Sequence, residues 1–469
     1  MVMGELTQRT ELLVIGGGPG GYAAALRAAE LGLEVTLVDA RGKPGGVCLY
    51  SGCIPSKVYL HLTRLIDEAR RAAAMGVRFD PPQIDLPALR GWKRSVIDDL
   101  ALRLRKSLEG SGIQLLRGRA EFESATRVRL RDAEISRIAF KQCIIATGAR
   151  QGRLAGVPEK PSPRLITPSE ALALNRIPPR LLVIGAGATG LELGTIYAVL
   201  GSRVVLVEQR EGLLPEADRD LTQPLEGRLA ELFEALHFNC TAVAAHEDED
   251  GVKVAFGGSG PAPQGTFDQV VMAVGRHPDS GGLGLERTGV RLDENGFIMV
   301  DDRQRTHDER IYAAGDVAGG PLLAHKAIRQ GRVAAEVIAG RPSGFDVRAL
   351  SQVIYTDPPI AWCGLTETQA RTEGHSVRIR RFDWTGSERA ATLGLNQGLT
   401  KIVVHRESGR ILGIGICGRN AEEMIAEGAL AVEMGALAED LALTLHPYPT
   451  LSETQAAAAE RIAVKPTSG

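Results

Sequence analysis

The chain has 469 residues, too many for one ordinary hydrophobic core, and this length predicts two to four domains. Hydrophobic residues make up 44% of the sequence and charged residues 24%, a balance typical of globular proteins. The formal net charge is -2, so we expect no nucleic-acid partner. We see neither a signal peptide nor an apolar run approaching roughly 18 residues, and therefore predict a cytoplasmic protein without a membrane span.

The first segments with a clear pattern form a unit that occurs twice. Residues 12–15 are an apolar run that leads into GGGPGG, an Ala-rich helical stretch and a strand ending in Asp39. Residues 181–184 lead in the same way into GAGATG, a helical stretch and a strand ending in Glu208. This order of strand, glycine turn, helix, strand and acid is that of a dinucleotide-binding βαβ unit. The sequence therefore predicts two dinucleotide sites.

Each glycine in these loops has a physical role. The first (Gly16, Gly185) permits the tight turn, the second (Gly18, Gly187) lets a pyrophosphate approach the backbone, and the third (Gly21, Gly190) lets the helix pack on the strand. The N-terminus of the following helix offers unpaired N–H groups to the phosphates. Asp39 and Glu208 are placed to accept hydrogen bonds from a ribose.

The second acid also predicts which nicotinamide cofactor binds. Glu208 can accept a hydrogen bond from a ribose 2′-hydroxyl and would repel a 2′-phosphate, so we expect NAD(H). Arg210 lies close in sequence, and its simplest interpretation is a surface cation.

The remaining segments predict further elements. Amphipathic helices are expected at about residues 58–74 and 92–109, buried strands ending at residues 148, 275 and 316, and a hairpin turn at the acidic residues 247–250. From about residue 346 the pattern changes to alternating strands, at residues 398–404 and 411–417, followed by helices from residue 421. We interpret this last part as a separate α+β domain.

The six cysteines fall into two groups. Four are isolated in apolar runs and are expected to be small buried hydrophobic residues: Cys143, Cys240, Cys363 and Cys417. The other two, Cys48 and Cys53, lie in GGVCLYSGCIPSK. In a regular helix their Cα atoms would be roughly 8.7 Å apart, whereas a disulfide needs less than about 7 Å.

A disulfide between Cys48 and Cys53 would therefore require a distorted backbone, which Gly52 and Pro55 permit. A strained bridge is easily reduced, and a position at a helix start lowers the pKa of a thiol. The spacing by itself leaves two ordinary core cysteines as an alternative. Two nucleotide sites in the same chain favour a redox-active pair instead.

Several motifs, in this order, resemble those of the pyridine nucleotide–disulfide oxidoreductases, and most of all their dihydrolipoamide dehydrogenase branch. The matching stretches are GGGPGG, GGVCLYSGCIPSK, ATG at 146–148, GAGATGLELG, YAAGDVAGGPLLAHKA, YTDPPIAWCGLTE and PTLSE. The resemblance implies an α/β fold with two Rossmann-like dinucleotide-binding domains, for FAD and NAD, plus an α+β C-terminal dimerisation domain. The implied boundaries are 1–150 for FAD binding, 151–275 for NAD binding, 276–345 for a central domain that completes the FAD site, and 346–469 for dimerisation.

The resemblance also implies roles for individual residues. Cys53 resembles the thiolate that faces the flavin, and Cys48 the one that exchanges with a dithiol substrate. Lys57 resembles the lysine beside the flavin, paired with Glu192. Asp316 resembles the acid that binds the ribityl chain. The expected cofactor-binding residues, with no metal site, are Gly16, Gly18, Gly21, Asp39, Thr147, Gly148, Gly315 and Asp316 for FAD, and Gly185, Gly187, Gly190, Glu208 and Gly275 for NAD.

The C-terminal motif departs from the family. The family has a histidine immediately before Pro-Thr, which takes the proton of the substrate thiol, and a glutamate that orients it. Here Glu453 is present, but the residue in the histidine register is Tyr448, and His446 falls two residues too early. A phenol with a reference pKa near 10 is a poor base at neutral pH. Either His446 acts as the base, or Tyr448 serves a reaction that tolerates a weak base, or the substrate is not free dihydrolipoamide.

We therefore expect an FAD-dependent, NAD-linked disulfide oxidoreductase that forms a homodimer and acts on a dithiol or disulfide, such as a lipoyl group on a carrier protein. The alternative is an NADH-dependent reductase of another disulfide, a metal ion or a small acceptor. Mercuric reductases carry a tyrosine in this region, but they also use a C-terminal cysteine pair, which this sequence lacks. A non-catalytic subunit with a structural flavin is a third hypothesis, and the retained Cys48, Cys53, Lys57 and Glu192 argue against it.

Overall fold

The fold is taken from a computed structural model, which describes residues 7–133, 135–152, 154, 162–395 and 397–463. The expectations about a signal peptide and a C-terminal cysteine pair concern in part residues 1–6 and 464–469, which lie outside the described residues. The chain forms two compact units. The first comprises the described residues of Met1–Pro55, Asp85–Gly152 and Gly275–Asp346, and the second those of Ser56–Ile84, Arg153–Val274 and Val347–Gly469.

The first unit is built on a sheet with the strand order β3-β2-β1-β6-β5-β4, in which β16 also pairs with β6. The pairs β1–β2, β1–β6, β2–β3 and β6–β16 are parallel, so these strands end at one edge. The strands are β1 (Thr7–Ile15), β2 (Val35–Asp39), β3 (Gln114–Arg117), β4 (Arg119–Ser124), β5 (Arg127–Arg131), β6 (Arg137–Ile145) and β16 (Ile311–Ala313), with β7 (Ala149–Gln151) and β15 (Arg276–Pro278) as a separate pair.

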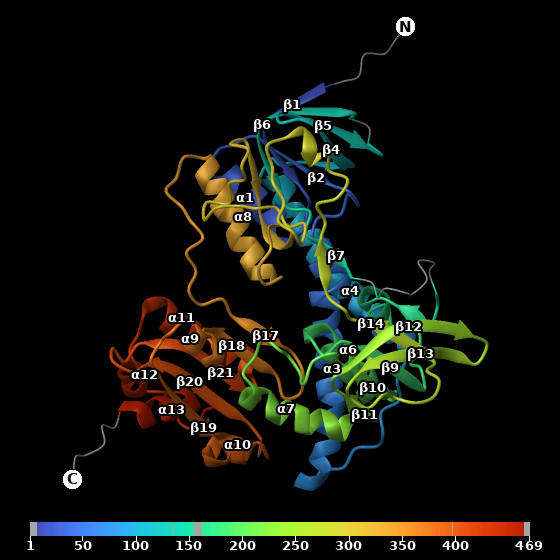
Figure 1. Cartoon of the computed structure of the whole chain (residues 1–469), viewed down its shortest axis with the longest axis vertical. Coiled ribbons are helices and arrows are strands. Elements are labelled where there is room, and N and C mark those ends of the chain that lie inside the picture. Colours follow the sequence, from blue (N-terminus) through green and yellow to red (C-terminus); the bar gives the residue numbers. More distant parts are fainter. Residues whose placement is uncertain (1–6, 134, 153, 155–161, 396, 464–469) are drawn as a thin grey trace. The chain divides into compact units, whose positions relative to one another are not determined.

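Two helices of this unit, α1 (Pro19–Glu30) and α8 (Ala324–Ile338), lie side by side (Figure 1). Their backbones touch, because a Cβ atom on Gly331 would stand 2.1 Å from the carbonyl oxygen of Gly20. The side chains of the buried Leu12 and Val14 of β1 belong to the same apolar cluster as α1 and α8. The other helices are α2 (Gly46–Ser51), α4 (Leu86–Gly110), η2 (Leu285–Arg287) and η3 (Gly315–Ala318).

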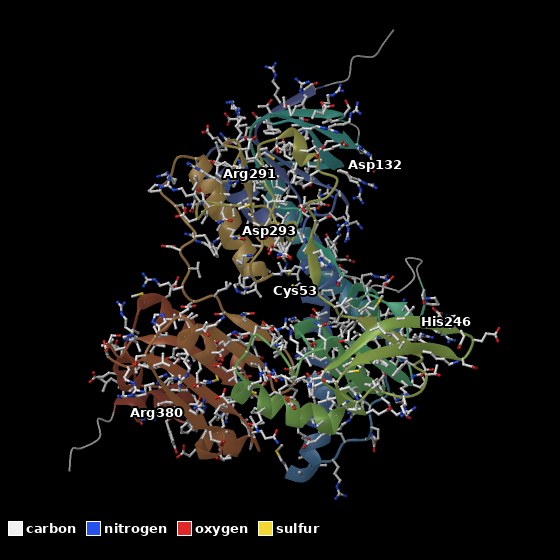
Figure 2. All side chains as sticks on the ribbon, in the orientation of Figure 1. Cys53, Asp132, His246, Arg291, Asp293 and Arg380 are labelled. Carbon is white, nitrogen blue, oxygen red and sulfur yellow. The ribbon has the colours of Figure 1, made fainter. Side chains whose placement is uncertain are left out.

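The second unit contains a parallel sheet with the order β11-β10-β9-β14-β8. Its strands are β8 (Leu165–Ile166), β9 (Arg180–Ile184), β10 (Arg203–Val207), β11 (Ala235–His237) and β14 (Gln269–Met272). The helices of this part are α3 (Cys53–Arg71), which begins within the first unit, η1 (Ala72–Met75), α5 (Pro168–Ala171), α6 (Ala188–Leu200) and α7 (Arg219–Leu232). The hairpin of β12 (Cys240–Asp248) and β13 (Gly251–Gly258), on which Figure 2 labels His246, turns at the predicted acidic run.

The same unit contains an antiparallel sheet with the order β17-β18-β21-β20-β19. Its strands are β17 (Gln352–Ile354), β18 (Ile360–Gly364), β19 (Val377–Asp383), β20 (Leu399–His405) and β21 (Ile411–Cys417). The helices are α9 (Glu367–Thr372), η4 (Trp384–Gly386), α10 (Glu388–Thr392), α11 (Ala421–Met434), α12 (Ala438–Leu443) and α13 (Glu453–Ala463). Several large apolar side chains of this part are exposed, namely Leu430, Met434, Leu443 and Leu445.

The predicted α/β class is confirmed, with two βαβ glycine-loop units and an α+β C-terminal part. The four isolated cysteines are buried, as predicted. The division into four domains stays a prediction. Among the described residues, no helix is both long and apolar enough to cross a membrane.

Candidate active site

The first glycine loop lies between β1 and α1. Gly16 has a φ of +107°, a conformation that glycine adopts without a steric penalty. A Cβ atom on Gly21 would stand 1.8 Å from the Gly16 carbonyl oxygen, so only glycine lets α1 pack this closely on the turn. At Gly18 the nearest described atom to such a Cβ is 4.0 Å away. The loop therefore leaves room for a pyrophosphate beside Gly18 and fits the nucleotide expected there.

The acid of this unit, Asp39, faces the glycine loop. One carboxylate oxygen accepts the Gly17 N–H at 3.1 Å, and the other accepts the N–H groups of Arg41 at 2.9 Å and Lys43 at 3.1 Å. Because a carboxylate has about four acceptor positions, Asp39 can still accept from a ribose.

The remaining residues expected around FAD follow strands β6 and β16 of the same sheet. The Thr147 hydroxyl donates to the Asp279 carbonyl at 2.8 Å, and the Gly148 carbonyl accepts the Asp279 N–H at 2.9 Å. Asp316 forms an ion pair of 2.9 Å with Arg276, which the sequence did not single out. The Gly315 N–H donates to a buried glutamine side chain at 3.0 Å. All of these residues lie at the carboxyl edge of the parallel strands, the usual ligand edge of such sheets.

The second glycine loop repeats the first in detail. A Cβ atom on Gly190 would stand 1.9 Å from the Gly185 carbonyl oxygen, whereas no described atom lies within 4 Å of one on Gly187. Glu208 accepts the N–H groups of Ala186 at 2.8 Å and Arg210 at 2.9 Å, as Asp39 does in the first loop. This loop also fits a dinucleotide. Arg210 is exposed, as the interpretation as a surface cation requires.

The expected residue Gly275 follows β14 and belongs to the first unit. There its carbonyl accepts the Gly152 N–H at 2.9 Å.

The cysteine pair lies where one helix ends and another begins. Cys48 is in α2, which ends at Ser51. Cys53, labelled in Figure 2, is the first residue of α3. Gly52 between them has φ and ψ of −139° and −104°, so the backbone leaves helical geometry at the predicted place. This break removes the spacing of a continuous helix. Cys48 is half-buried and Cys53 exposed.

The start of α2 is fixed to the first glycine loop. The Gly45 N–H donates to the Gly17 carbonyl at 2.6 Å, and a Cβ atom on Gly46 would stand 2.7 Å from the Gly18 Cα atom. Two glycines in series therefore bring the cysteine helix into backbone contact with the nucleotide loop. Burial raises the pKa of Tyr22 on α1, and the negative charges of the two cysteines raise it further.

In the second unit, Lys57 and Glu192 form the ion pair that the resemblance implied. The Lys57 ammonium lies 2.9 Å from both carboxylate oxygens of Glu192. Lys57 belongs to α3, four residues after Cys53, and Glu192 lies in the first turns of α6. Sequence reasoning missed a third member: the Tyr355 ring lies 4.4 Å from the ammonium, and its backbone N–H donates to Glu192 at 3.2 Å. The YTDPP motif was the available signal.

The same unit contains an open pocket of about 220 Å³ beside this pair, lined among others by Lys57, Tyr355 and the charged cluster of Asp67, Arg228 and Asp357. The Arg71 guanidinium lies 2.9 Å from both Asp67 and Asp357, and Arg228 lies 2.8 Å from Asp67. Burial raises the pKa of Asp357. No motif predicted this cluster, because its members come from α3, α7 and the segment after β17.

The C-terminal candidates have distinct environments. The Tyr448 residue is 73% exposed. The His446 ring lies 3.0 Å from the Thr444 carbonyl through Nδ1 and 2.8 Å from Glu427 through Nε2, so both ring nitrogens face acceptors. The Glu453 carboxylate accepts the Thr450 N–H at 2.6 Å. This structure agrees with a structural role for His446.

Two dinucleotide loops, with a cysteine pair fixed to one of them, define a flavoprotein disulfide oxidoreductase. Residues 10–331 match the family model described as pyridine nucleotide-disulphide oxidoreductase, and residues 350–459 match the dimerisation domain of that family. The chain belongs to the pyridine nucleotide-disulphide oxidoreductase family, whose dihydrolipoyl dehydrogenases use FAD and NAD. It is an NAD-dependent enzyme.

Individual relatives match the chain over nearly its full length. The dihydrolipoyl dehydrogenase of Geobacillus stearothermophilus is 40% identical over 461 residues, covering 98% of this chain and 97% of the relative. That of Vibrio parahaemolyticus is 39% identical over 455 residues, covering 96% of this chain and 95% of the relative. The crystal structure of LpdA from Mycobacterium tuberculosis has a TM-score of 0.88 and 30% identity, covering 97% of this chain and 99% of that one.

Proposed function

We propose that this protein oxidises dihydrolipoyl groups to the cyclic disulfide and delivers the electrons to NAD+. The observation that carries the proposal is the identity of 39% and 40% with relatives named dihydrolipoyl dehydrogenase over 96% and 98% of the chain. The dithiol loses two electrons and two protons; NAD+ takes both electrons and one proton as hydride, and the other proton goes to solvent. Bound FAD would supply the two-electron relay between sulfur and nicotinamide.

In this proposal Cys48 and Cys53 form the disulfide that the substrate reduces. A substrate thiolate attacks the Cys48 sulfur, the disulfide breaks, and Cys53 leaves as a thiolate. The second substrate thiol, as a thiolate, then displaces Cys48 and closes the lipoyl ring. The helix break at Gly52 supports a bridge between the two cysteines, and their separate roles follow from the family motif.

The nucleotide assignments follow the two loops. Gly16, Gly18, Gly21 and Asp39, with Thr147, Gly148, Gly315 and Asp316, would hold FAD. Gly185, Gly187, Gly190, Glu208 and Gly275 would hold NAD, and the Glu208 carboxylate disfavours a 2′-phosphate. Lys57, paired with Glu192, would place a positive charge beside the flavin.

The substrate side of the disulfide depends on the C-terminal segment. We propose that Tyr448 and Glu453 of a second copy face the substrate thiol, because the family match includes a dimerisation domain. Tyr448 would donate a hydrogen bond there rather than accept the proton, while His446 stays paired with Glu427. A lipoyl group carried on a protein is the proposed physiological substrate, and the cytoplasm the proposed location.

The comparisons do not favour the alternative of an NADH-dependent reductase of another acceptor. The two functions separate in a steady-state assay of dihydrolipoamide with NAD+ against NADH with candidate acceptors. NADH formation from dihydrolipoamide supports the proposal. Reduction of an acceptor by NADH without any dihydrolipoamide turnover would contradict it.

The cysteine roles have a separate readout in the same holoenzyme. Limited NADH should produce long-wavelength absorbance, the signature of a thiolate lying against an oxidised flavin. Cys53→Ala should abolish this absorbance, whereas Cys48→Ala should show it before any NADH is added, because Cys53 is then a free thiolate; both variants should lose dithiol turnover. Cys240→Ala, at a buried cysteine outside the pair, is the matched control and should behave as wild type. The reverse pattern would exchange the two roles.

A further inference from the structure

Tyr355, the residue after β17, contacts both members of the Lys57–Glu192 pair. Its ring lies 4.4 Å from the Lys57 ammonium, and its backbone N–H donates to a Glu192 carboxylate oxygen at 3.2 Å. The same carboxylate oxygen lies 2.9 Å from the ammonium. One residue therefore binds the cation through a side chain and the anion through the backbone.

The two charges differ in how firmly the rest of the fold holds them. The Glu192 side chain is 7% exposed, whereas the Lys57 side chain is 33% exposed. A lysine ammonium sits on a flexible four-carbon stem and is strongly hydrated. An aromatic ring face beside it attracts the charge and excludes water from that side. The ring therefore adds a second contact, besides the Glu192 carboxylate, that restrains the exposed end of Lys57.

The segment that carries Tyr355 is itself fastened to the helix that carries Lys57. One guanidinium nitrogen of Arg71 lies 2.9 Å from Asp357 and 2.9 Å from Asp67. Arg71 and Asp67 both belong to α3. The Thr356 hydroxyl donates to the Pro358 carbonyl at 2.8 Å and closes the turn. The segment that follows Tyr355 is thus joined by an ion pair to the helix that carries Lys57.

We propose that Tyr355 is a positioning residue for Lys57, with its ring holding the ammonium and its N–H holding the Glu192 carboxylate. This inference rests on the proposed role of Lys57 beside the flavin. A positive charge held there stabilises the anionic reduced flavin relative to the neutral oxidised one. Loss of the ring leaves Glu192 as the ion-pair partner of the ammonium and admits water on the side that the ring covered, so the positive charge is held less closely and the flavin becomes harder to reduce.

The test is a titration of the flavin-loaded enzyme against a redox dye, without any dithiol substrate. Tyr355→Leu removes the ring and keeps the backbone N–H; Tyr355→Phe keeps both. At a fixed dye potential, Tyr355→Leu should raise the ratio of oxidised to reduced flavin by about twofold to fivefold, the factor that a partly exposed cation–π contact is worth. Tyr355→Phe should leave the ratio at the wild-type value.

A second series changes the electrostatics without the shape. Fluorinated phenylalanines at position 355 weaken the negative face of the ring at nearly constant volume, so the ratio should rise with each added fluorine. This series keeps the test decisive if Tyr355→Leu does not fold. Equal shifts in Tyr355→Leu and Tyr355→Phe, or no trend with fluorination, would overturn the inference.

The Lys57→Met background shows whether Tyr355 acts through Lys57. There, Tyr355→Leu should have no further effect on the ratio, and a persisting effect would contradict the inference. If Lys57→Met itself leaves the ratio unchanged, the proposed role of Lys57 fails and the inference fails with it. Neither result depends on dihydrolipoamide turnover. A failure of the inference about Tyr355 can therefore be told apart from a wrong assignment of the substrate.

Discussion

At the scale of single residues, Tyr448 is where this chain differs most from the family pattern. It occupies the register in which the family has a histidine that takes the substrate proton. The nearby His446 does not obviously replace it, because its two ring nitrogens already face the Thr444 carbonyl and Glu427. Glu427 in turn accepts from the buried Gln455 side chain at 2.8 Å. Moving His446 into the site would break both of these contacts, at a cost in free energy.

Without a base at position 448, the substrate must arrive as a thiolate. We therefore expect kcat/KM for dihydrolipoamide to rise about tenfold per pH unit up to the thiol pKa, near about 8.5 for an ordinary thiol. Tyr448→His should instead give a plateau above about pH 6.5, with at least about a tenfold gain at neutral pH. Initial rates between pH 6 and 9 test this, with His446→Asn as the control that should keep the wild-type profile. A profile unchanged in Tyr448→His would mean that Tyr448 does not face the substrate.

The sequence foresaw Lys57 and Glu192 but not Tyr355, and the difference has a physical cause. The resemblance to the family assigns roles to the first two, whereas it assigns none to Tyr355, although Tyr355 lies in the YTDPP motif. Tyr355 contacts them only because β17 and the segment after it pack against α3 and α6. No local pattern encodes a contact between residues so far apart in sequence.

At the scale of elements, the two glycine loops show how a short sequence defines a local structure. Both loops place a glycine where a side chain would strike a carbonyl oxygen, and both acids accept an N–H from the loop itself. These features follow from strand, turn and helix geometry, so the order of residues was sufficient to predict them. The hairpin at residues 247–250 was predictable for the same reason.

The second loop offers a test that separates folding from nucleotide binding. In Gly190→Ala the new methyl group strikes the Gly185 carbonyl, so we expect a loss of about 2 kcal/mol or more in the free energy of unfolding. In Gly187→Ala no described atom lies within 4 Å, and φ is −78°, so the fold should change by less than about 1 kcal/mol. The methyl group would instead obstruct a pyrophosphate and weaken NAD(H) binding at least about tenfold.

Denaturant unfolding and calorimetric titration with NADH measure the two effects separately. The flavin absorbance serves as a control, because the first loop is unchanged in both variants. If Gly187→Ala bound NADH as well as wild type, the second loop would not be the nucleotide site.

At the scale of the whole molecule, the most notable feature within one unit is a buried lysine. The Lys401 side chain, on β20, is 3% exposed, and its ammonium lies 3.0 Å from Asp218, 2.9 Å from Asp220 and 2.9 Å from Glu367. Burial alone would raise the pKa of Asp220 and of Glu367, but hydrogen bonds from Lys401 and the nearby arginines outweigh it and lower both values. The cluster joins the start of α7 to α9 and β20, which are far apart in sequence.

Removal of this lysine should be costly, because it takes the buried cation from three partly buried carboxylates and leaves the more exposed arginines to pair with Asp220 and Glu367. We expect Lys401→Met to lower the free energy of unfolding by about 3–5 kcal/mol. The matched control is Lys253→Met, which removes an exposed lysine paired with Asp248 at 2.8 Å and should cost less than about 1 kcal/mol. Denaturant unfolding of the three proteins compares them directly.

The pH dependence follows from the sign of the shifts. Asp220 and Glu367 have lower pKa values in the folded protein than when unfolded, so they stabilise the fold above about pH 4, their unfolded values. That stabilisation is lost as the pH falls through the folded values. The difference in stability between wild type and Lys401→Met should therefore shrink below about pH 4. A difference that stayed constant between pH 7 and pH 3 would show that these carboxylates are not the partners that matter.

The order of residues was enough to predict the two glycine-loop units, the redox cysteine motif and the α+β character of the C-terminal part. These features depend on residues close together in the chain, where spacing and turn chemistry decide the structure. Three contacts became visible in the tertiary structure alone: the Tyr355 ring beside the Lys57 ammonium, the hydrogen bond between Glu427 and His446, and the ion pairs of Lys401 with three carboxylates. Each of these groups comes from separate elements, so packing rather than any local pattern brings their charges together.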